Sequence, residues 1–135
     1  MSYEAWGEPD DSPFDAAAEA GWINPEDTSK AIIDVMNERD RQWNERGFTP
    51  ELDDGYQGFE LTKAAVSYAQ RAAMSDDFRK LEEERDLVPH PWPWSRHGWK
   101  PKDRRSDLVR AAALIVAEIE RLDRAEKRAQ QQGER

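Results

Sequence analysis

The sequence contains no cysteine, only two histidines, and no apolar run longer than AAALIVA at residues 111–117. Without cysteine, the chain has no disulfides, no thiolate nucleophile and no cysteine-ligated zinc. The apolar run is far shorter than the roughly 20 residues that a membrane-spanning helix needs. The start, MSYEAWGEPDD, lacks the basic and apolar regions of a signal peptide. We therefore expect a cytoplasmic protein without a membrane partner.

Positive charge is also in short supply. The chain has 20 lysines and arginines against 29 aspartates and glutamates, which gives a formal net charge of -9. Proteins that follow the phosphates of nucleic acids are basic overall, so this balance argues against direct nucleic-acid binding. It suits a basic protein partner, a nucleic-acid mimic, or solubility alone.

Helical periodicity dominates the chain, and no useful stretch alternates polar and apolar residues. The pattern predicts an all-α protein. We expect a compact bundle of four to five helices, with a Trp/Pro-rich loop before a long C-terminal helix. Residues 1–25 read as an acidic N-terminal arm with a short helix, residues 26–124 as a helical domain, and residues 125–135 as a polar, frayed tail.

Three helices show apolar faces that predict a core. A helix ending near residue 46 places five residues on one face, Ile32, Val35, Met36, Arg39 and Trp43. A helix over about 59–74 presents mostly small residues, Leu61, Ala64, Ala65, Tyr68 and Ala72, which allow a close helix–helix approach. The last helix carries a stripe that should lie at the centre of the bundle, Leu108, Ala112, Ile115, Ile119 and Leu122, widened by Leu114 and Val116.

The stretch HPWPWSRHGWKPKDRR, residues 90–105, concentrates aromatic and positive side chains. It holds three of the six tryptophans, both histidines, and five basic residues against one acid. Basic side chains at the start of a helix are unfavourable unless an anion lies beside them. One candidate anion is internal, the acidic run at residues 82–84. The other is a ligand phosphate or an acidic partner surface, with an indole stacking on a base.

Arg39 lies within an apolar stripe, four residues before Trp43. It either stacks on that indole or lines a pocket for an anion. The ligand-binding hypothesis therefore comprises ten residues, Arg39, Trp43, Trp92, Trp94, His97, Trp99, Lys100, Lys102, Arg104 and Arg105.

Carboxylates offer an alternative. Small all-α nucleotide pyrophosphohydrolases of the MazG kind hold Mg²⁺ with a Glu-x-x-Glu helix facing a Glu-x-x-Asp helix. A hydrolase of this kind would use Glu60, Glu118 and Asp123 here, with Mg²⁺ as its only cofactor. However, Glu120 lies away from the apolar stripe, and Glu38 lies opposite Ile32. Such acids diverge, which favours a binding protein with no catalytic residues, metal or cofactor.

Three phrases, NERDRQWNERGFTPELDD, ELTKAAVSYA and WKPKDRRSDLVRAAALIVAEIERLDR, resemble a family of small phage and prophage proteins. The family pattern is E-R-x-R-Q…G-W-T-P-E-x-D-D, then G-E-L-A-x-A-A-x-Y-A, then a tryptophan-led helix ending A-E-I-E-R-L-D-R. The likeness covers roughly residues 37–124. This chain has Phe48 in place of tryptophan and Phe59 in place of glycine.

A second similarity is to the ryanodine-receptor repeat, on Trp43, residues 47–48 and the pair at residues 53–54. The first resemblance implies a phage accessory protein that acts in the host cytoplasm. Such a protein would serve an anti-defence role, either by sequestering a nucleotide-like ligand or by inhibiting a host defence protein, and could form a homo-oligomer.

Overall fold

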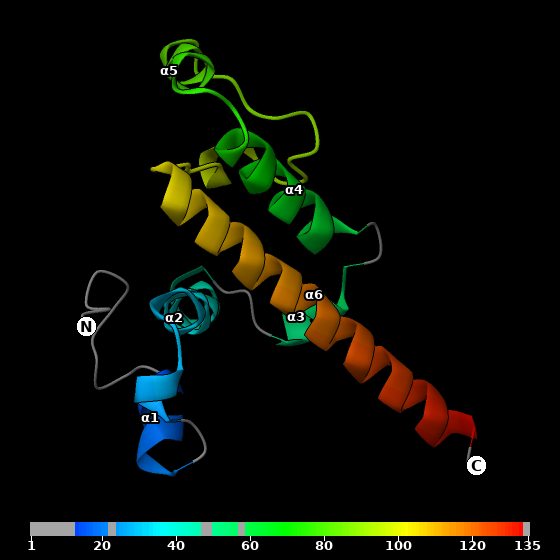
Figure 1. Ribbon diagram of the computed structural model, residues 1–135. Helices are drawn as coiled ribbons and strands as arrows, with labels where there is room; N and C mark the ends of the chain where they lie inside the picture. Colours follow the sequence, from blue (N-terminus) through cyan, green and yellow to red (C-terminus); the bar gives the residue numbers. More distant parts are fainter. Residues whose placement is uncertain (1–12, 22–23, 47–49, 57–58, 134–135) are drawn as a thin grey trace. The chain divides into compact units, whose positions relative to one another are not determined.

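The computed structural model describes residues 13–21, 24–46, 50–56 and 59–133. Within these ranges the chain forms α-helices and short 3-10 helices and no strand, which confirms the all-α prediction and the long C-terminal helix (Figure 1). No helix in the described part is long and apolar enough to cross a membrane. Most of the predicted acidic arm, residues 1–12, and Phe48 lie outside the described residues.

The chain divides into two compact units, residues 1–49 and residues 50–135. The sequence had placed its first boundary after residue 25.

The N-terminal unit contains α1 (Pro13–Glu19), a 3-10 helix (Pro25–Asp27) and α2 (Lys30–Arg46), and α1 packs against α2. Ser29 caps α2, because its Oγ accepts a hydrogen bond from the Ile32 backbone N–H at 3.2 Å. Arg39 stacks over the Trp43 ring with its guanidinium carbon 5.7 Å from the ring centroid. The stacking alternative for this pair is therefore confirmed.

The predicted core face of α2 is wrong. Ile32 and Trp43 are exposed, whereas Asp34, Glu38 and Gln42 are buried. Lys30 pairs with Asp34 at 2.7 Å, and Arg41 pairs with Glu38 at 2.6 Å, so carboxylates buried on this face are neutralised by neighbours one turn away. Local pairing of this kind allows a polar face to be buried, which apolar periodicity does not reveal.

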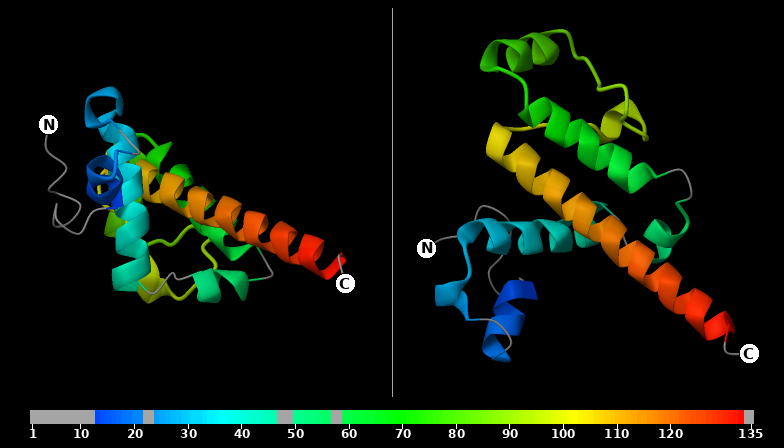
Figure 2. Two further views of the ribbon diagram at one scale, coloured as in Figure 1. Left: turned by 90° about the horizontal axis from the view of Figure 1, so that it is seen from below. Right: turned by 45° about the vertical axis from the view of Figure 1, so that its right-hand side comes forward.

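The C-terminal unit contains α3 (Pro50–Asp54), α4 (Glu60–Ala72), α5 (Asp76–Glu84), a 3-10 helix (Arg96–Gly98) and α6 (Arg104–Gly133). Helix α4 runs antiparallel to the first half of α6, and the second half of α6 extends beyond α4 (Figures 1 and 2). Residues 125–133, predicted as a polar tail, continue α6 as helix. Asp54 ties α3 to that half through Arg124 and Arg128, which lower the pKa of its carboxyl group.

Small side chains make the α4–α6 contact close, as the sequence predicted for α4. Alanines from both helices are buried, Ala64, Ala65 and Ala72 from α4 and Ala111, Ala113 and Ala117 from α6. The predicted stripe of α6 is wrong, because Leu108, Ile115, Ile119 and Leu122 are exposed. The buried side of α6 carries Val109 and Leu114 as well as alanines, so it is a different face from the predicted stripe.

Phe59, the residue before α4, has a left-handed backbone with φ 66° and ψ 30°. A side chain with a Cβ is disfavoured by roughly 1–2 kcal/mol in this region, and glycine is not. We expect Phe59→Gly to raise the free energy of unfolding by up to about 1 kcal/mol, because the exposed phenyl ring contributes little packing. Phe59→Ala retains the Cβ and should give no gain in the same urea titration. Equal stabilisation by both variants would show that the ring, not the backbone, is responsible.

Candidate anion-binding site

The loop between α5 and α6 packs its tryptophans against α4. Tyr68 of α4 lies 4.7 Å from Trp99 and 5.6 Å from Trp92 between ring centroids. Trp94 contacts Trp92 edge-on at 5.3 Å. Trp92 also donates its indole N–H to the Ser95 carbonyl at 2.9 Å. Three of the predicted ligand-binding aromatics thus form one fixed cluster over the core, which restricts their motion and positions the residues that follow them.

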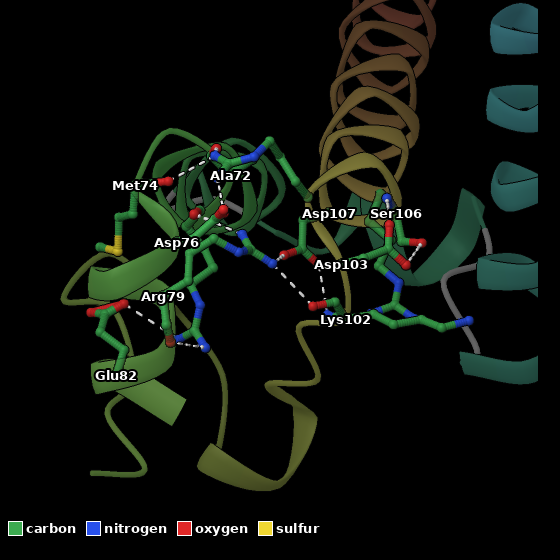
Figure 3. Close-up of polar contacts among 12 residues, drawn as sticks. Ala72, Met74, Asp76, Arg79, Glu82, Lys102, Asp103, Ser106 and Asp107 are labelled. Atoms are coloured by element: carbon green, nitrogen blue, oxygen red, sulfur yellow. Dashed lines mark hydrogen bonds and ion pairs between the residues drawn. The ribbon is translucent and has the colours of Figure 1, made fainter. Parts of the chain in front are cut away.

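The positive charge of Arg104 at the start of α6 is explained by the acceptors around its guanidinium. Its guanidinium donates to the Ala72 carbonyl, to the Met74 carbonyl at 2.7 Å and to the Asp76 carboxylate at 2.7 Å. Because α4 and α6 are antiparallel, the first turn of α6 lies beside the negative C-terminal end of α4. Figure 3 shows these carbonyls and Asp76 near that turn. The anion that Arg104 contacts is therefore this helix end with Asp76, while Glu83 of the predicted run at residues 82–84 lies near Arg104 and Lys102.

The first turn of α6 also has its own acid. Asp103 accepts hydrogen bonds from the backbone N–H and the hydroxyl of Ser106, both at 2.8 Å. These two bonds lower the pKa of the Asp103 carboxyl group. Asp103 thus acts as the N-cap of α6 and offsets the basic side chains on either side of it.

A buried ion pair joins α5 to α6. Arg79 donates to the Asp107 carboxylate at 3.0 Å, to the Lys102 carbonyl at 3.0 Å and to the Arg71 carbonyl at 2.8 Å. Asp107 accepts a further bond from the Lys102 backbone N–H at 2.8 Å. Figure 3 shows Arg79, Asp107 and Lys102 converging. The sequence did not single out Arg79 or Asp107, because no local pattern links residues so far apart in the chain.

Arg71 of α4 is the buried centre of this region, with only 4% of its surface exposed. Its terminal nitrogens donate to Glu82 at 3.3 Å and to the Arg79 carbonyl at 3.0 Å. Its Nε is buried and forms no hydrogen bond. No sequence signal points to Arg71, since a polar side chain on the inner face of a helix looks like an exception to its apolar pattern.

Two neighbouring hollows share Arg71 and Glu83 in their walls. The first, which we call the basic hollow, has a volume of about 320 Å³ and is lined by five basic and three acidic residues, Arg71, Arg79, Lys80, Lys102, Arg104, Asp76, Glu83 and Asp103. The second, the tryptophan hollow, has a volume of about 350 Å³ and is lined by Arg71, Glu82, Glu83, Asp86, Leu87, Trp99, Lys100 and Pro101.

Three lysines around the hollows differ from the arginines in their partners. The ammonium groups of Lys80, Lys100 and Lys102 form no ion pair with any described carboxylate, whereas Arg71, Arg79 and Arg104 all have internal partners. The arginines therefore build the walls of the basic hollow, and Lys80 and Lys102 give it positive charge. Its lining carries five positive against three negative groups.

The structure brings together only part of the predicted ligand-binding set. Trp99 and Lys100 line the tryptophan hollow, and Lys102 and Arg104 line the basic hollow. His97 and Arg105 are exposed and line neither hollow. Trp92 lines a separate hollow of about 480 Å³ beside His90, Glu60 and Lys63. Arg39 and Trp43 belong to the N-terminal unit, which is described on its own.

Two of the alternative catalytic carboxylates, Glu118 and Glu60, act on one side chain, Arg121, and both raise its pKa. Glu118 is buried and accepts hydrogen bonds from Thr62 and from Arg121, and it raises the pKa of Arg121. Glu60 is the first residue of α4, and Asp123 is exposed. Glu120 is also exposed, as the sequence predicted. Among the described residues no group of three or more acids or histidines is arranged to hold a metal ion. Glu38, predicted to point outward, is buried.

No family model, no curated protein and no solved structure matches this chain. What the site does must therefore be inferred from its own residues.

Proposed function

We propose that the protein binds a phosphate-bearing, nucleotide-like small molecule without converting it, with the phosphate in the basic hollow. The observation that carries this proposal is that five cationic side chains gather around one hollow of a chain of net charge -9. The three arginines already have carboxylate partners, whereas Lys80 and Lys102 form no ion pair with a described carboxylate. An acidic protein gains nothing in solubility by placing five cations around one depression. The arrangement fits an anion that several fixed donors contact at once.

The arginines of the basic hollow are held in place before any ligand arrives. Arg79 and Arg104 are each fixed by three hydrogen bonds to carbonyl or carboxylate groups. A donor that is already immobile loses little conformational entropy on binding. Lys80 and Lys102 would then pair with the phosphate, since neither forms an ion pair with a described carboxylate, although the charge of Lys102 also lowers the pKa of the Asp103 carboxyl group.

The adjoining tryptophan hollow supplies a place for the rest of the ligand. Trp99 is rigid because it packs on Tyr68, and its indole Nε1 is buried without a hydrogen-bond partner. Arg71, whose Nε is likewise unsatisfied, lies in the walls of both hollows. A buried donor without an acceptor costs about 1–3 kcal/mol. A ligand with a phosphate and a polar ring offers acceptors for both donors.

Binding without catalysis competes with hydrolysis by Glu60, Glu118 and Asp123, and the exposure of Asp123 favours binding. It also suits the phage accessory role that the sequence resemblance implies, in which a small protein removes a nucleotide signal from a host defence system. The competing proposal within that role is inhibition of a host protein, which requires no small ligand.

The test is a thermal-shift screen against mono-, di- and cyclic nucleotides, with and without Mg²⁺, followed by calorimetry on the nucleotide that stabilises the protein most. We expect stabilisation without Mg²⁺ that weakens as salt rises. The double variant Lys80→Ala/Lys102→Ala should raise Kd at least about tenfold, because each lost charge-assisted bond is worth roughly 1.5–3 kcal/mol. The matched control is Lys127→Ala, an exposed lysine on α6 that lines neither hollow.

Three results would contradict the proposal. No nucleotide stabilises the protein, which would direct attention to a host protein partner. A nucleotide binds, but Lys80→Ala/Lys102→Ala leaves its Kd unchanged, which would place the site elsewhere. Nucleotide is hydrolysed when Mg²⁺ is present, which would support the pyrophosphohydrolase alternative.

A further inference from the structure

Helix α6 presents an uncovered apolar stripe to solvent. Leu108 is 50% exposed, Ile115 47%, Ile119 52% and Leu122 52%. The four side chains follow one another along one face of a single helix, so they form a contiguous apolar surface. Contiguous exposed apolar surface on a folded protein marks an interaction site rather than scattered surface hydrophobes.

The spacing of the stripe is that of a helix that pairs with another helix. Starting at Leu108, apolar residues follow at alternating intervals of four and three through Ala112, Ile115, Ile119 and Leu122. After Glu126 the pattern resumes at Ala129. This stretch covers three heptads and about 33 Å of helix at 1.5 Å per residue. Apolar heptads of that length are typical of a helix–helix seam.

Charges at the two ends of the stripe indicate the partner. Arg105 lies in the same sector at the N-terminal end, while Asp123 and Glu126 lie in it at the C-terminal end, and all three are exposed. The pattern is centred on Ile115, since Leu108 and Leu122 stand seven residues before and after it. Two copies in antiparallel orientation would place Arg105 of each beside the acids of the other. Parallel copies would place like charges together.

We propose that a second copy of this chain docks on the stripe, with the two α6 helices antiparallel about a two-fold axis near Ile115. Leu108 of one copy would then pack near Leu122 of the other. This interface goes beyond the proposed ligand binding and uses no residue that lines either hollow. It also explains why aliphatic side chains of this size remain outside the α4–α6 contact.

The experiment is sedimentation equilibrium on the full chain over a range of concentrations. We expect a mass twice the 15.6 kDa of one chain. Ile115→Glu should return the protein to a monomer, because the two-fold axis brings the two introduced carboxylates together. Since Ile115 is exposed, circular dichroism should show an unchanged helical content. Nucleotide affinity should also be unchanged, so failure of this interface is distinguishable from failure of the proposed function.

A charge exchange tests the orientation. Arg105→Glu alone, and Asp123→Lys/Glu126→Lys alone, should each weaken the dimer at least about tenfold, and an equimolar mixture of the two variants should restore it. Parallel pairing predicts no weakening by the first variant. A wild-type protein that is monomeric at every concentration, or a dimer that survives Ile115→Glu, would overturn the proposal. The stripe would then be covered by the N-terminal unit or by a different protein.

Discussion

Asp107→Ala should lower the free energy of unfolding by about 3 kcal/mol. The Asp107 carboxylate is fully buried and accepts hydrogen bonds from Arg79 and from the Lys102 backbone N–H. The side chain of Arg79 is only 12% exposed. Removing the Asp107 carboxylate therefore leaves a largely buried guanidinium without its counter-charge, which is costly where water cannot solvate it. The measurement is urea unfolding followed by circular dichroism.

The control is an ion pair of the same chemistry at the surface. Asp76 pairs with Arg104 at 2.7 Å, but its side chain is 95% exposed. Asp76→Ala should therefore change stability by less than about 1 kcal/mol. Equal losses for the two variants would show that the pair between Arg79 and Asp107 is as accessible to water as a surface pair, contrary to its burial.

Leu114→Ala should also lower the free energy of unfolding by about 3 kcal/mol, because it leaves a cavity in a close-packed contact. Leu114 is 1% exposed on α6. Leu108→Ala, the same substitution on the outer face of the same helix, should cost less than about 1 kcal/mol. Both are measured in the Ile115→Glu background, so that self-association does not contribute.

This comparison decides which face of α6 is inside. The apolar periodicity of the sequence predicts that Leu108 is the core residue, and the structure assigns that role to Leu114. A larger loss for Leu108→Ala than for Leu114→Ala, measured by urea unfolding at several protein concentrations, would reverse the assignment and remove the basis of the proposed dimer.

Of the two roles predicted for residues 90–105, only the structural one is visible in the contacts of particular side chains, and ligand binding stays a proposal. Arg104 satisfies carbonyls at the end of α4, and the tryptophans cover Tyr68, so these residues serve the fold. The side chains of Lys100 and Lys102 form no such structural contacts, and they line the tryptophan hollow and the basic hollow, respectively. A charge count over the whole stretch does not separate them, since arginine and lysine contribute equally to it.

Local features were predictable from the sequence because their causes are local. Helical periodicity gave the all-α class, and the prolines of residues 89–101 kept the segment between α5 and α6 from forming a long helix. Ser75 caps α5 by accepting a hydrogen bond from the Phe78 backbone N–H, as its position before two acids predicts. The stacking of Arg39 on Trp43 follows from a separation of one helical turn.

Only the tertiary structure decided which helix faces are buried and which charges pair. On α4 and α6, alanines are buried together with larger side chains, Leu61, Tyr68, Val109 and Leu114. The other large aliphatic residues of α6, Leu108, Ile115, Ile119 and Leu122, are exposed. Arg79 meets Asp107, and Arg104 meets Ala72, across about 30 residues of chain. Pairings of that range depend on how helices pack, a property that the spacing of residues within one helix does not contain.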